Sequence, residues 1–193
     1  MKTAAWKANR TLECEGLACP MPVVKTKKAI EELNAGEVLE IRATDKGSVA
    51  DLQSWTKRTG HQYIGHHEEN GVFSHYIRKA DPSEVKEETK YPHTVSLDEI
   101  KALLESGEKL NIIDVREPAE YAFGHLPGAI SIPAGELDAR LQELDKEKEY
   151  SIVCRTGSRS DMACGMLASK GFTKVKNVMP GMKSWEGEVE KDD

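Results

Sequence analysis

A cysteine between a short apolar run and a helical pattern constrains the fold of this chain more than any other feature. Residues 150–153, Y-S-I-V, have the composition of a short buried strand. The loop C-R-T-G-S-R-S (154–160) follows, and residues 161–170 then follow a helical pattern with Met162, Met166 and Leu167 on one apolar face. This order predicts a strand, a short loop and a helix, and it predicts an α/β fold for this half of the chain.

The position of Cys154 favours a reactive thiol. Backbone N–H groups at the start of a helix point toward this position, and the helix dipole is positive there. Arg155 and Arg159 add positive charge. Each of these effects lowers a thiol pKa and stabilises an anionic sulfur species. We therefore expect Cys154 to be a catalytic nucleophile rather than a buried structural cysteine.

The length of this loop limits which anionic group it can surround. A cysteine-based phosphatase loop needs five residues between its cysteine and arginine to surround a phosphate, and here only four residues separate Cys154 from Arg159. The shorter ring suits a cysteine that carries one extra sulfur, a persulfide. The paired arginines argue against a turn that contains a cysteine by chance. We expect the donor anion to be bound by the loop residues Arg155, Thr156, Gly157, Ser158 and Arg159.

Residues 93–187 resemble a single-domain rhodanese. The resemblance rests on the stretch D-V-R-E-P-A-E-Y-A-F-G-H-L-P-G-A-I-S-I-P (114–133), on the loop at 154–160 and on P-G-M-K-S-W (180–185). It implies an α/β domain with a central parallel sheet and a sulfurtransferase active site at Cys154. A small donor such as thiosulfate or a low-molecular-weight persulfide would supply the sulfur.

The first eighty residues follow a different pattern. Strands and helices are expected to alternate in the order β-α-β-α-β-β, which is typical of a two-layer α/β sandwich. The Asn-Gly step between the last two strands favours a tight hairpin turn. The expected elements are strand 11–14, a helix from Pro20 to about Asn34, strand 38–41, helix 47–57, and strands 62–67 and 72–78.

Cys19 lies just before Pro20, at the start of the first expected helix. The free N–H groups and the helix dipole again favour a thiolate or a persulfide there. A helix cap is the structural alternative, but Ser, Thr, Asp and Asn cap helices better than cysteine does. We therefore expect Cys19 to be a second catalytic thiol.

The residues around Cys19 resemble the TusA/SirA-like sulfur-carrier family. The resemblance covers residues 10–79 and rests on L-E-C-E-G-L-A-C-P-M-P-V-V-K (12–25) and A-T-D-K-G-S-V-A-D-L-Q-S-W (43–55). It implies that Cys19 accepts a sulfane sulfur as a persulfide and passes it to a protein. Cys14 departs from the family pattern. It is expected to pack in the core, although a resolving role toward Cys19 stays open.

A charged, apolar-poor stretch bounded by Pro82 and Pro92 reads as a linker. We therefore predict a carrier domain over residues 1–79, a linker over 80–92 and a rhodanese-like domain over 93–193.

The composition of the chain indicates where the protein is located in the cell and which classes of partner it lacks. No apolar stretch is long enough to cross a bilayer, and residues 1–10 lack the apolar core of a signal peptide. Four cysteines do not make a disulfide framework here, so we expect a cytoplasmic protein with no membrane partner. The net charge of −6 argues against nucleic-acid binding, and the uneven distribution of charge, +2 over residues 1–80 and −8 over the rest, does not change that.

The remaining polar and sulfur-containing residues are expected to be structural. Cys164 should be a small buried hydrophobe, and no Cys or His pair has zinc-site spacing, so neither metal nor cofactor is expected. The other expectations are an Asp114–Arg116 ion pair, backbone contacts for His125, and core positions for Trp55 and Trp185.

These observations favour a sulfurtransferase in which Cys154 takes up sulfane sulfur and Cys19 receives it for a protein acceptor. Two alternatives remain at this stage. One is a thiol redox or arsenate-reductase-like enzyme that pairs Cys154 with Cys164 or Cys19. The other is an N-terminal binding module joined to a separate rhodanese activity.

Overall fold

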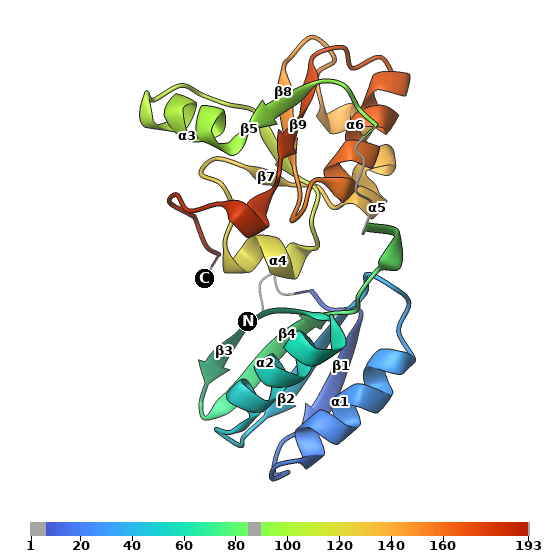
Figure 1. Cartoon of the computed structure of the whole chain (residues 1–193), viewed down its shortest axis with the longest axis vertical. Helices are drawn as coiled ribbons and strands as arrows, with labels where there is room; N and C mark the ends of the chain where they lie inside the picture. The colour runs from blue at the N-terminus through green and yellow to red at the C-terminus, as the bar shows by residue number, and fades with distance from the viewer. Residues whose placement is uncertain (1–6, 85–89, 193) are drawn as a thin grey trace. The chain divides into compact units, whose positions relative to one another are not determined.

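The computed structural model describes residues 7–84 and 90–192 (Figure 1). The chain divides into two compact units, Met1–Pro82 and Ser83–Asp193. Residues 85–89 of the predicted linker and residues 1–6 of the segment used to argue against a signal peptide lie outside the described residues.

The N-terminal unit is a four-stranded sheet in the order β1-β2-β4-β3, with two helices on one face (Figure 1). The first two strands are parallel and the other pairs are antiparallel. This arrangement confirms the predicted two-layer sandwich. Its elements are β1 (Arg10–Cys14), α1 (Met21–Glu31), β2 (Val38–Ala43), α2 (Ser48–Thr59), β3 (Gln62–Glu69) and β4 (Val72–Arg78).

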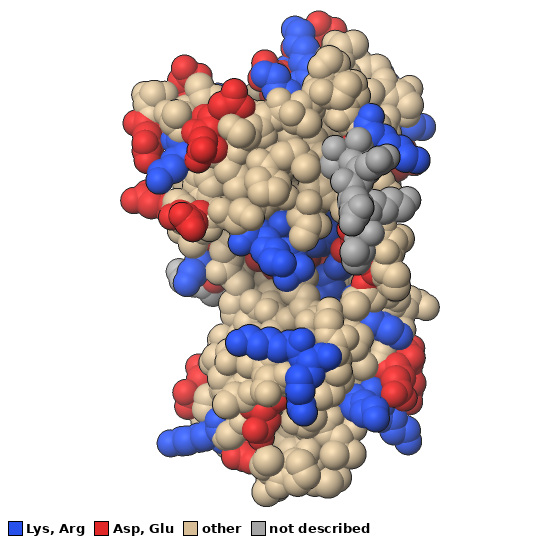
Figure 2. All heavy atoms as spheres, in the orientation of Figure 1, with Lys and Arg blue, Asp and Glu red and all other residues tan. Residues whose placement is uncertain are grey.

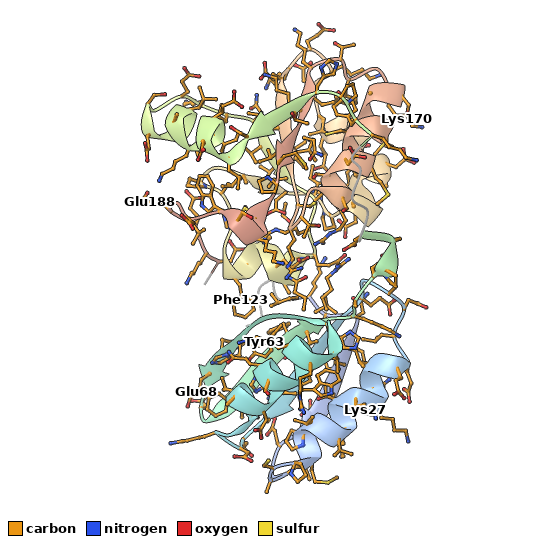
Figure 3. All side chains as sticks on the ribbon, viewed as in Figure 1. Lys27, Tyr63, Glu68, Phe123, Lys170 and Glu188 are labelled. Atoms are coloured by element: carbon orange, nitrogen blue, oxygen red, sulfur yellow. The ribbon has the colours of Figure 1, made fainter. Side chains whose placement is uncertain are left out.

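Apolar residues at helical and strand spacing build the core of this unit. Ile30 of α1 and Leu52 of α2 pack against the sheet, and Trp55 is buried as predicted. On the opposite face of α1, Lys27 is exposed (Figure 3). The hairpin turns at Asn70 and Gly71 with φ of 52° and 78°, the left-handed geometry that favours an Asn-Gly step.

A buried histidine joins α2 to the sheet. His75 on β4 is fully buried, and its Nε2 lies 2.9 Å from the Ser48 hydroxyl at the first residue of α2. Its Nδ1 lies 2.7 Å from the phenol oxygen of Tyr63, which is labelled in Figure 3. Burial lowers the pKa of His75 to about 4, so the ring is neutral at neutral pH. The start of α2 is therefore fixed to the sheet by satisfied buried polar groups.

The C-terminal unit has a five-stranded sheet in the order β5-β9-β8-β6-β7, and every neighbouring pair is parallel. The predicted central parallel sheet is confirmed. The strands are β5 (Thr94–Ser96), β6 (Ile112–Asp114), β7 (Ile130–Ser131), β8 (Tyr150–Val153) and β9 (Val175–Met179). The α-helices are α3 (Leu97–Glu105), α4 (Pro118–Phe123), α5 (Ala134–Leu137) and α6 (Ser158–Ser169). Short 3₁₀ helices span Asp138–Glu143 and Met182–Ser184, and a third, Pro82–Glu84, spans the boundary between the two units.

The helix after Cys154 differs from its prediction in two respects. It begins at Ser158 rather than Asp161, because Gly157 adopts φ of 88° and ends the loop directly. Met162 is exposed, so its predicted place on the apolar face is wrong. Besides Arg159, the buried residues of this helix are the small Ser160, Ala163 and Cys164, together with Leu167.

Three structural predictions for this unit have clear outcomes. The buried Asp114–Arg116 ion pair is confirmed, with 2.6 Å between Oδ2 and Nη2. His125 bonds the backbone oxygen of Tyr121 at 2.8 Å, as expected. Trp185 is only partly buried, so a full core position is wrong for it.

Candidate functional sites

Cys154 is the first residue after the central strand β8 and precedes α6. Its Sγ accepts a hydrogen bond from the Gly157 N–H at 3.1 Å and lies 3.2 Å from the Ser160 hydroxyl. The residue is fully buried, so the expectation that this thiol is not buried is wrong. The reason is local, since the short loop turns back and brings the Gly157 N–H onto the sulfur.

A buried polar chain supports this arrangement. The Ser160 hydroxyl donates to Asn177 Oδ1 at 2.6 Å, and Asn177 Nδ2 donates to the Gly157 carbonyl at 3.2 Å. Because the only hydroxyl proton of Ser160 goes to Asn177, its oxygen is free to accept the thiol proton of Cys154. Sequence reasoning missed Asn177, because it follows Lys176 in a strand of mixed polar and apolar residues and so carried no clear signal.

Arg159 does not face outward from the loop. It is buried, and its two terminal nitrogens lie 2.8 Å and 3.0 Å from the carboxylate oxygens of Glu120 on α4. Its Nε also lies 3.6 Å from Glu84. Glu120 was missed because only the fold brings α4 to this helix. A role of Arg159 in anion binding stays a prediction, and its positive charge is already paired.

The other predicted anion-binding residues of the loop differ in their exposure to solvent. Arg155 is partly exposed and Thr156 is exposed, whereas Gly157 is buried under the sulfur. The hydroxyl of Ser158 donates to the Glu84 carbonyl at 2.6 Å. Of the five predicted anion-binding residues, Thr156 is thus the one that is exposed to solvent, and the anion-binding role stays a prediction.

The P-G-M-K stretch braces this loop from the side of β9. The N–H of Met182 donates to the Cys154 carbonyl at 2.8 Å, and the N–H of Lys183 donates to the Arg155 carbonyl at 3.0 Å. Gly181 has φ of 120°, and a Cβ there would lie 2.6 Å from the Arg155 carbonyl oxygen. The close approach thus requires glycine at this position.

Gly157→Ala should weaken sulfurtransfer and lower the stability of the C-terminal unit by about 1–2 kcal/mol. Its φ of 88° disfavours a side chain, and a Cβ would lie 2.5 Å from Met179 Sδ and 3.3 Å from the Pro180 carbonyl. The matched control is Gly165→Ala within α6, where a Cβ meets nothing within 4 Å. Urea unfolding and turnover should separate the two variants, and equal behaviour would contradict the strain at Gly157.

Cys19 is exposed and precedes α1. Its N–H donates to Asp45 Oδ2 at 2.8 Å. A hydrogen bond to Asp51 and the negative charges of Asp51 and Asp45 raise the pKa of the Cys19 thiol. These carboxylates therefore oppose the effect that the helix terminus was expected to have on this thiol. Both carboxylates belong to the quoted 43–55 motif, but the sequence alone did not place them beside Cys19.

The other two cysteines pack in the cores of their units. Cys14 and Cys164 are fully buried, and burial raises the pKa of each thiol. All four cysteines are free, so no bond joins Cys14 to Cys19. In the described residues, no group of three His, Cys, Asp or Glu could hold a metal ion, and no helix is long and apolar enough to cross a membrane.

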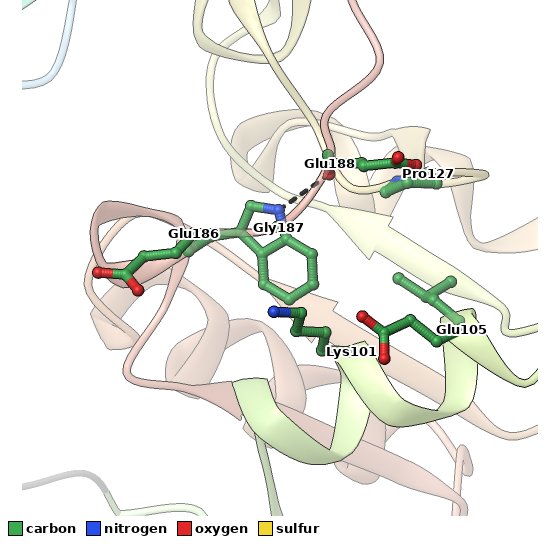
Figure 4. Close-up of a pocket in the computed structure, with 8 residues that line it drawn as sticks. Lys101, Glu105, Pro127, Glu186, Gly187 and Glu188 are labelled. Atoms are coloured by element: carbon green, nitrogen blue, oxygen red, sulfur yellow. Dashed lines mark hydrogen bonds between the residues drawn. The ribbon is translucent and has the colours of Figure 1, made fainter.

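A surface pocket of about 620 Å³ lies between α3 and the segment after β9 (Figure 4). Trp185 forms one wall, and its indole N–H donates to the Glu188 carbonyl at 2.9 Å. On the face seen in Figure 2, acidic side chains gather over the α3 part of this unit. The pocket contains no cysteine, and neither catalytic prediction falls in it.

Comparisons with known proteins agree with these two sites. The family described as "Sulfurtransferase TusA" matches residues 10–79, and the family described as "Rhodanese-like domain" matches residues 96–188. A Bacillus subtilis protein named "Putative sulfur carrier protein YrkF" is 48% identical over 184 residues, covering 95% of this chain and 99% of that protein. The chain belongs to the family of TusA–rhodanese fusion proteins. Both resemblances seen in the sequence are confirmed.

Each half of this fusion protein also matches a separate relative. The sulfur carrier protein TusA of Allochromatium vinosum is 38% identical over 72 residues, which is 37% of this chain and 95% of that protein. The crystal structure of a rhodanese-like domain protein from Staphylococcus aureus is 32% identical and covers 53% of this chain and all of its own, with a TM-score of 0.50. The fusion protein therefore combines a sulfur-carrier domain with a sulfurtransferase domain.

Proposed function

We propose that Cys154 takes up sulfane sulfur as a persulfide and that Cys19 receives this sulfur and passes it to a protein acceptor. The observation that supports this most directly is the Gly157 N–H on the Cys154 sulfur, at 3.1 Å in the loop between β8 and α6. A backbone donor at this position stabilises anionic sulfur. The TusA domain in the same chain supplies a carrier thiol of the matching chemistry.

The proposed donor is thiosulfate or a low-molecular-weight persulfide, which would enter past Arg155 and Thr156. The Cys154 thiolate attacks the outer sulfur of thiosulfate, the S–S bond of the donor breaks, and its electron pair leaves with sulfite. Cys19 then attacks the outer sulfur of the Cys154 persulfide, and Cys154 leaves as a thiolate. The sulfur moves as a neutral atom between thiolates, so neither metal nor organic cofactor takes part.

The proposed setting is the cytoplasm, in which thiols stay reduced. The four free cysteines support this setting, because persulfide exchange needs unpaired thiols. Membrane and nucleic-acid partners have no place in this proposal.

The relay predicts that labelled sulfur loaded on Cys154 appears on Cys19. The test is peptide mass spectrometry of the full chain after incubation with thiosulfate labelled in its outer sulfur, with Cys19→Ala as the control. Mixing Cys154→Ser protein with Cys19→Ala protein then shows whether transfer occurs between chains. Label that never reaches Cys19 in the parent protein, even with excess donor, would refute the relay.

The redox alternative receives no support from the positions of the cysteines. A reductase would need a second thiol that forms a bond with Cys154, whereas all four cysteines are free and burial raises the pKa of Cys164. Intact mass after incubation with thiosulfate separates the two chemistries. Gain of one sulfur atom supports transfer, whereas loss of two hydrogens to a Cys–Cys bond supports reductase chemistry.

A further inference from the structure

The two proposed sulfur-carrying thiols lie in opposite electrostatic surroundings. At Cys154, a backbone N–H donates to the sulfur. Cys19 is exposed, and its backbone N–H donates to the carboxylate of Asp45. Asp51 and Asp45 raise the pKa of its thiol. A small anion is therefore favoured near one thiol and repelled near the other.

The carboxylates beside Cys19 are held in place by the fold. Asp45 Oδ2 accepts the Cys19 N–H at 2.8 Å, and its Oδ1 accepts the Gly47 N–H at 3.0 Å. These two charge-assisted bonds lower the pKa of Asp45, which keeps the carboxylate ionised. Asp45 thus cannot turn away from the Cys19 backbone without losing both bonds.

Asp51 is fixed by its helix. It lies in the first turn of α2, and its N–H donates to the Gly47 carbonyl at 3.1 Å. Ser48, at the first residue of the same helix, is bonded to the buried His75. The Asp51 carboxylate, which helps to raise the pKa of the Cys19 thiol, therefore projects from a helix start that is anchored to the sheet.

We propose that Asp45 and Asp51 are specificity-determining residues that exclude small anionic sulfur donors, such as thiosulfate and inorganic polysulfide, from Cys19. Cys19 is then loaded from a persulfide held on a protein, whose own groups offset the two negative charges. The inference rests on the proposed function of Cys19 as a sulfur carrier and adds which class of donor it accepts.

The excluded and the permitted steps have the same balance of atoms. The Cys19 thiol loses its proton to water, and its sulfur forms a bond to the outer sulfur of the donor. The old S–S bond breaks, and its electron pair stays on the leaving group, which is sulfite from thiosulfate or a cysteine thiolate from a protein persulfide. The two carboxylates disfavour the first case, because thiosulfate brings two negative charges to the site.

The test uses the full chain with Cys154→Ala, so that the rhodanese-like half cannot load sulfur. The variant adds Asp45→Asn and Asp51→Asn, and Asp51→Asn alone serves if the double change unfolds the domain. Cys19 modification is followed with two methanethiosulfonate reagents, one with a sulfonate and one with a trimethylammonium group. Their rate ratio cancels the fraction of thiolate, because both reagents consume the same thiolate.

The ratio of cation to anion rates should be well above one in the parent and should fall in the variant. One unit charge at about 4 Å in water changes the rate of a singly charged reagent roughly fivefold, so a fall of fivefold or more is expected. Thiosulfate should also load Cys19 faster in the variant, as seen by intact mass. The matched control is Glu31→Gln at the end of α1, about 15 Å along the helix from its first residue.

An unchanged ratio in a folded variant overturns the inference, as does equal thiosulfate loading of parent and variant. The proposed function is judged separately by the label relay in the unmodified chain. A changed ratio together with a failed relay would refute the carrier role and leave the charge effect standing.

Discussion

Cys154→Ser is expected to reduce thiosulfate:cyanide sulfurtransfer by at least about a thousandfold, the scale of loss when an enzyme loses its nucleophile. Serine is close in size to cysteine, so the buried loop should keep its shape. The hydrogen-bond partners that the structure gives this sulfur are the Gly157 N–H and the Ser160 hydroxyl. Neither is a base that could activate a serine hydroxyl.

The measurement is the rate of thiocyanate formation, with thermal unfolding to confirm the fold. Cys164→Ala is the matched control, because it removes a buried thiol from the same domain that has no proposed chemistry. It should keep activity per folded molecule. Activity of the serine variant above a few per cent of the parent would show that another group carries the sulfur.

Glu120→Gln should lower the free energy of unfolding of the C-terminal unit by about 3–5 kcal/mol, the cost of breaking a buried ion pair from one side. The Glu120 carboxylate holds both terminal nitrogens of Arg159, and the two side chains are only 1% and 7% exposed. Its Oε2 also accepts the Glu117 N–H at 2.9 Å. The amide keeps the shape of the carboxylate and leaves the arginine charge without its main partner.

Urea unfolding measures this loss, and Glu143→Gln is the matched control. Glu143 pairs with Arg140 at 2.8 Å, but its side chain is 46% exposed, so its loss should cost no more than about 1 kcal/mol. Adding Arg159→Met to Glu120→Gln should recover part of the stability, because the buried charge is then gone. Equal losses for Glu120→Gln and Glu143→Gln would contradict a structural role for the buried pair.

The sequence predicted best where the signal is local. The strand before Cys154, the loop and the helix after it follow one another within twenty residues, and composition and periodicity are enough to recognise them. The Asn70–Gly71 turn is predictable for the same reason. Met162 was assigned wrongly because it lies five residues from the buried Leu167, and residues five apart point to different sides of a helix.

Groups that meet only through the sheet order could not be predicted. Asn177 reaches Ser160 because β9 lies beside β8, and Glu120 reaches Arg159 from a different helix. The carboxylates of Asp45 and Asp51 oppose the expected effect of the helix terminus on Cys19. In each case the residue was visible in the sequence, but its partner was set by long-range packing.

The order of strands in the C-terminal unit has a consequence for its synthesis on the ribosome. β5 is the first strand of this sheet to be made, yet its neighbour is β9, the last, and β9 separates it from β8. The Cys154 loop is likewise braced by Met182 and Lys183, which follow β9. A nascent chain released before about residue 183 would carry the Cys154 loop without these two backbone hydrogen bonds. The N-terminal unit, made first, can fold while the C-terminal unit is still being translated, so Cys19 reaches its folded surroundings before Cys154 does.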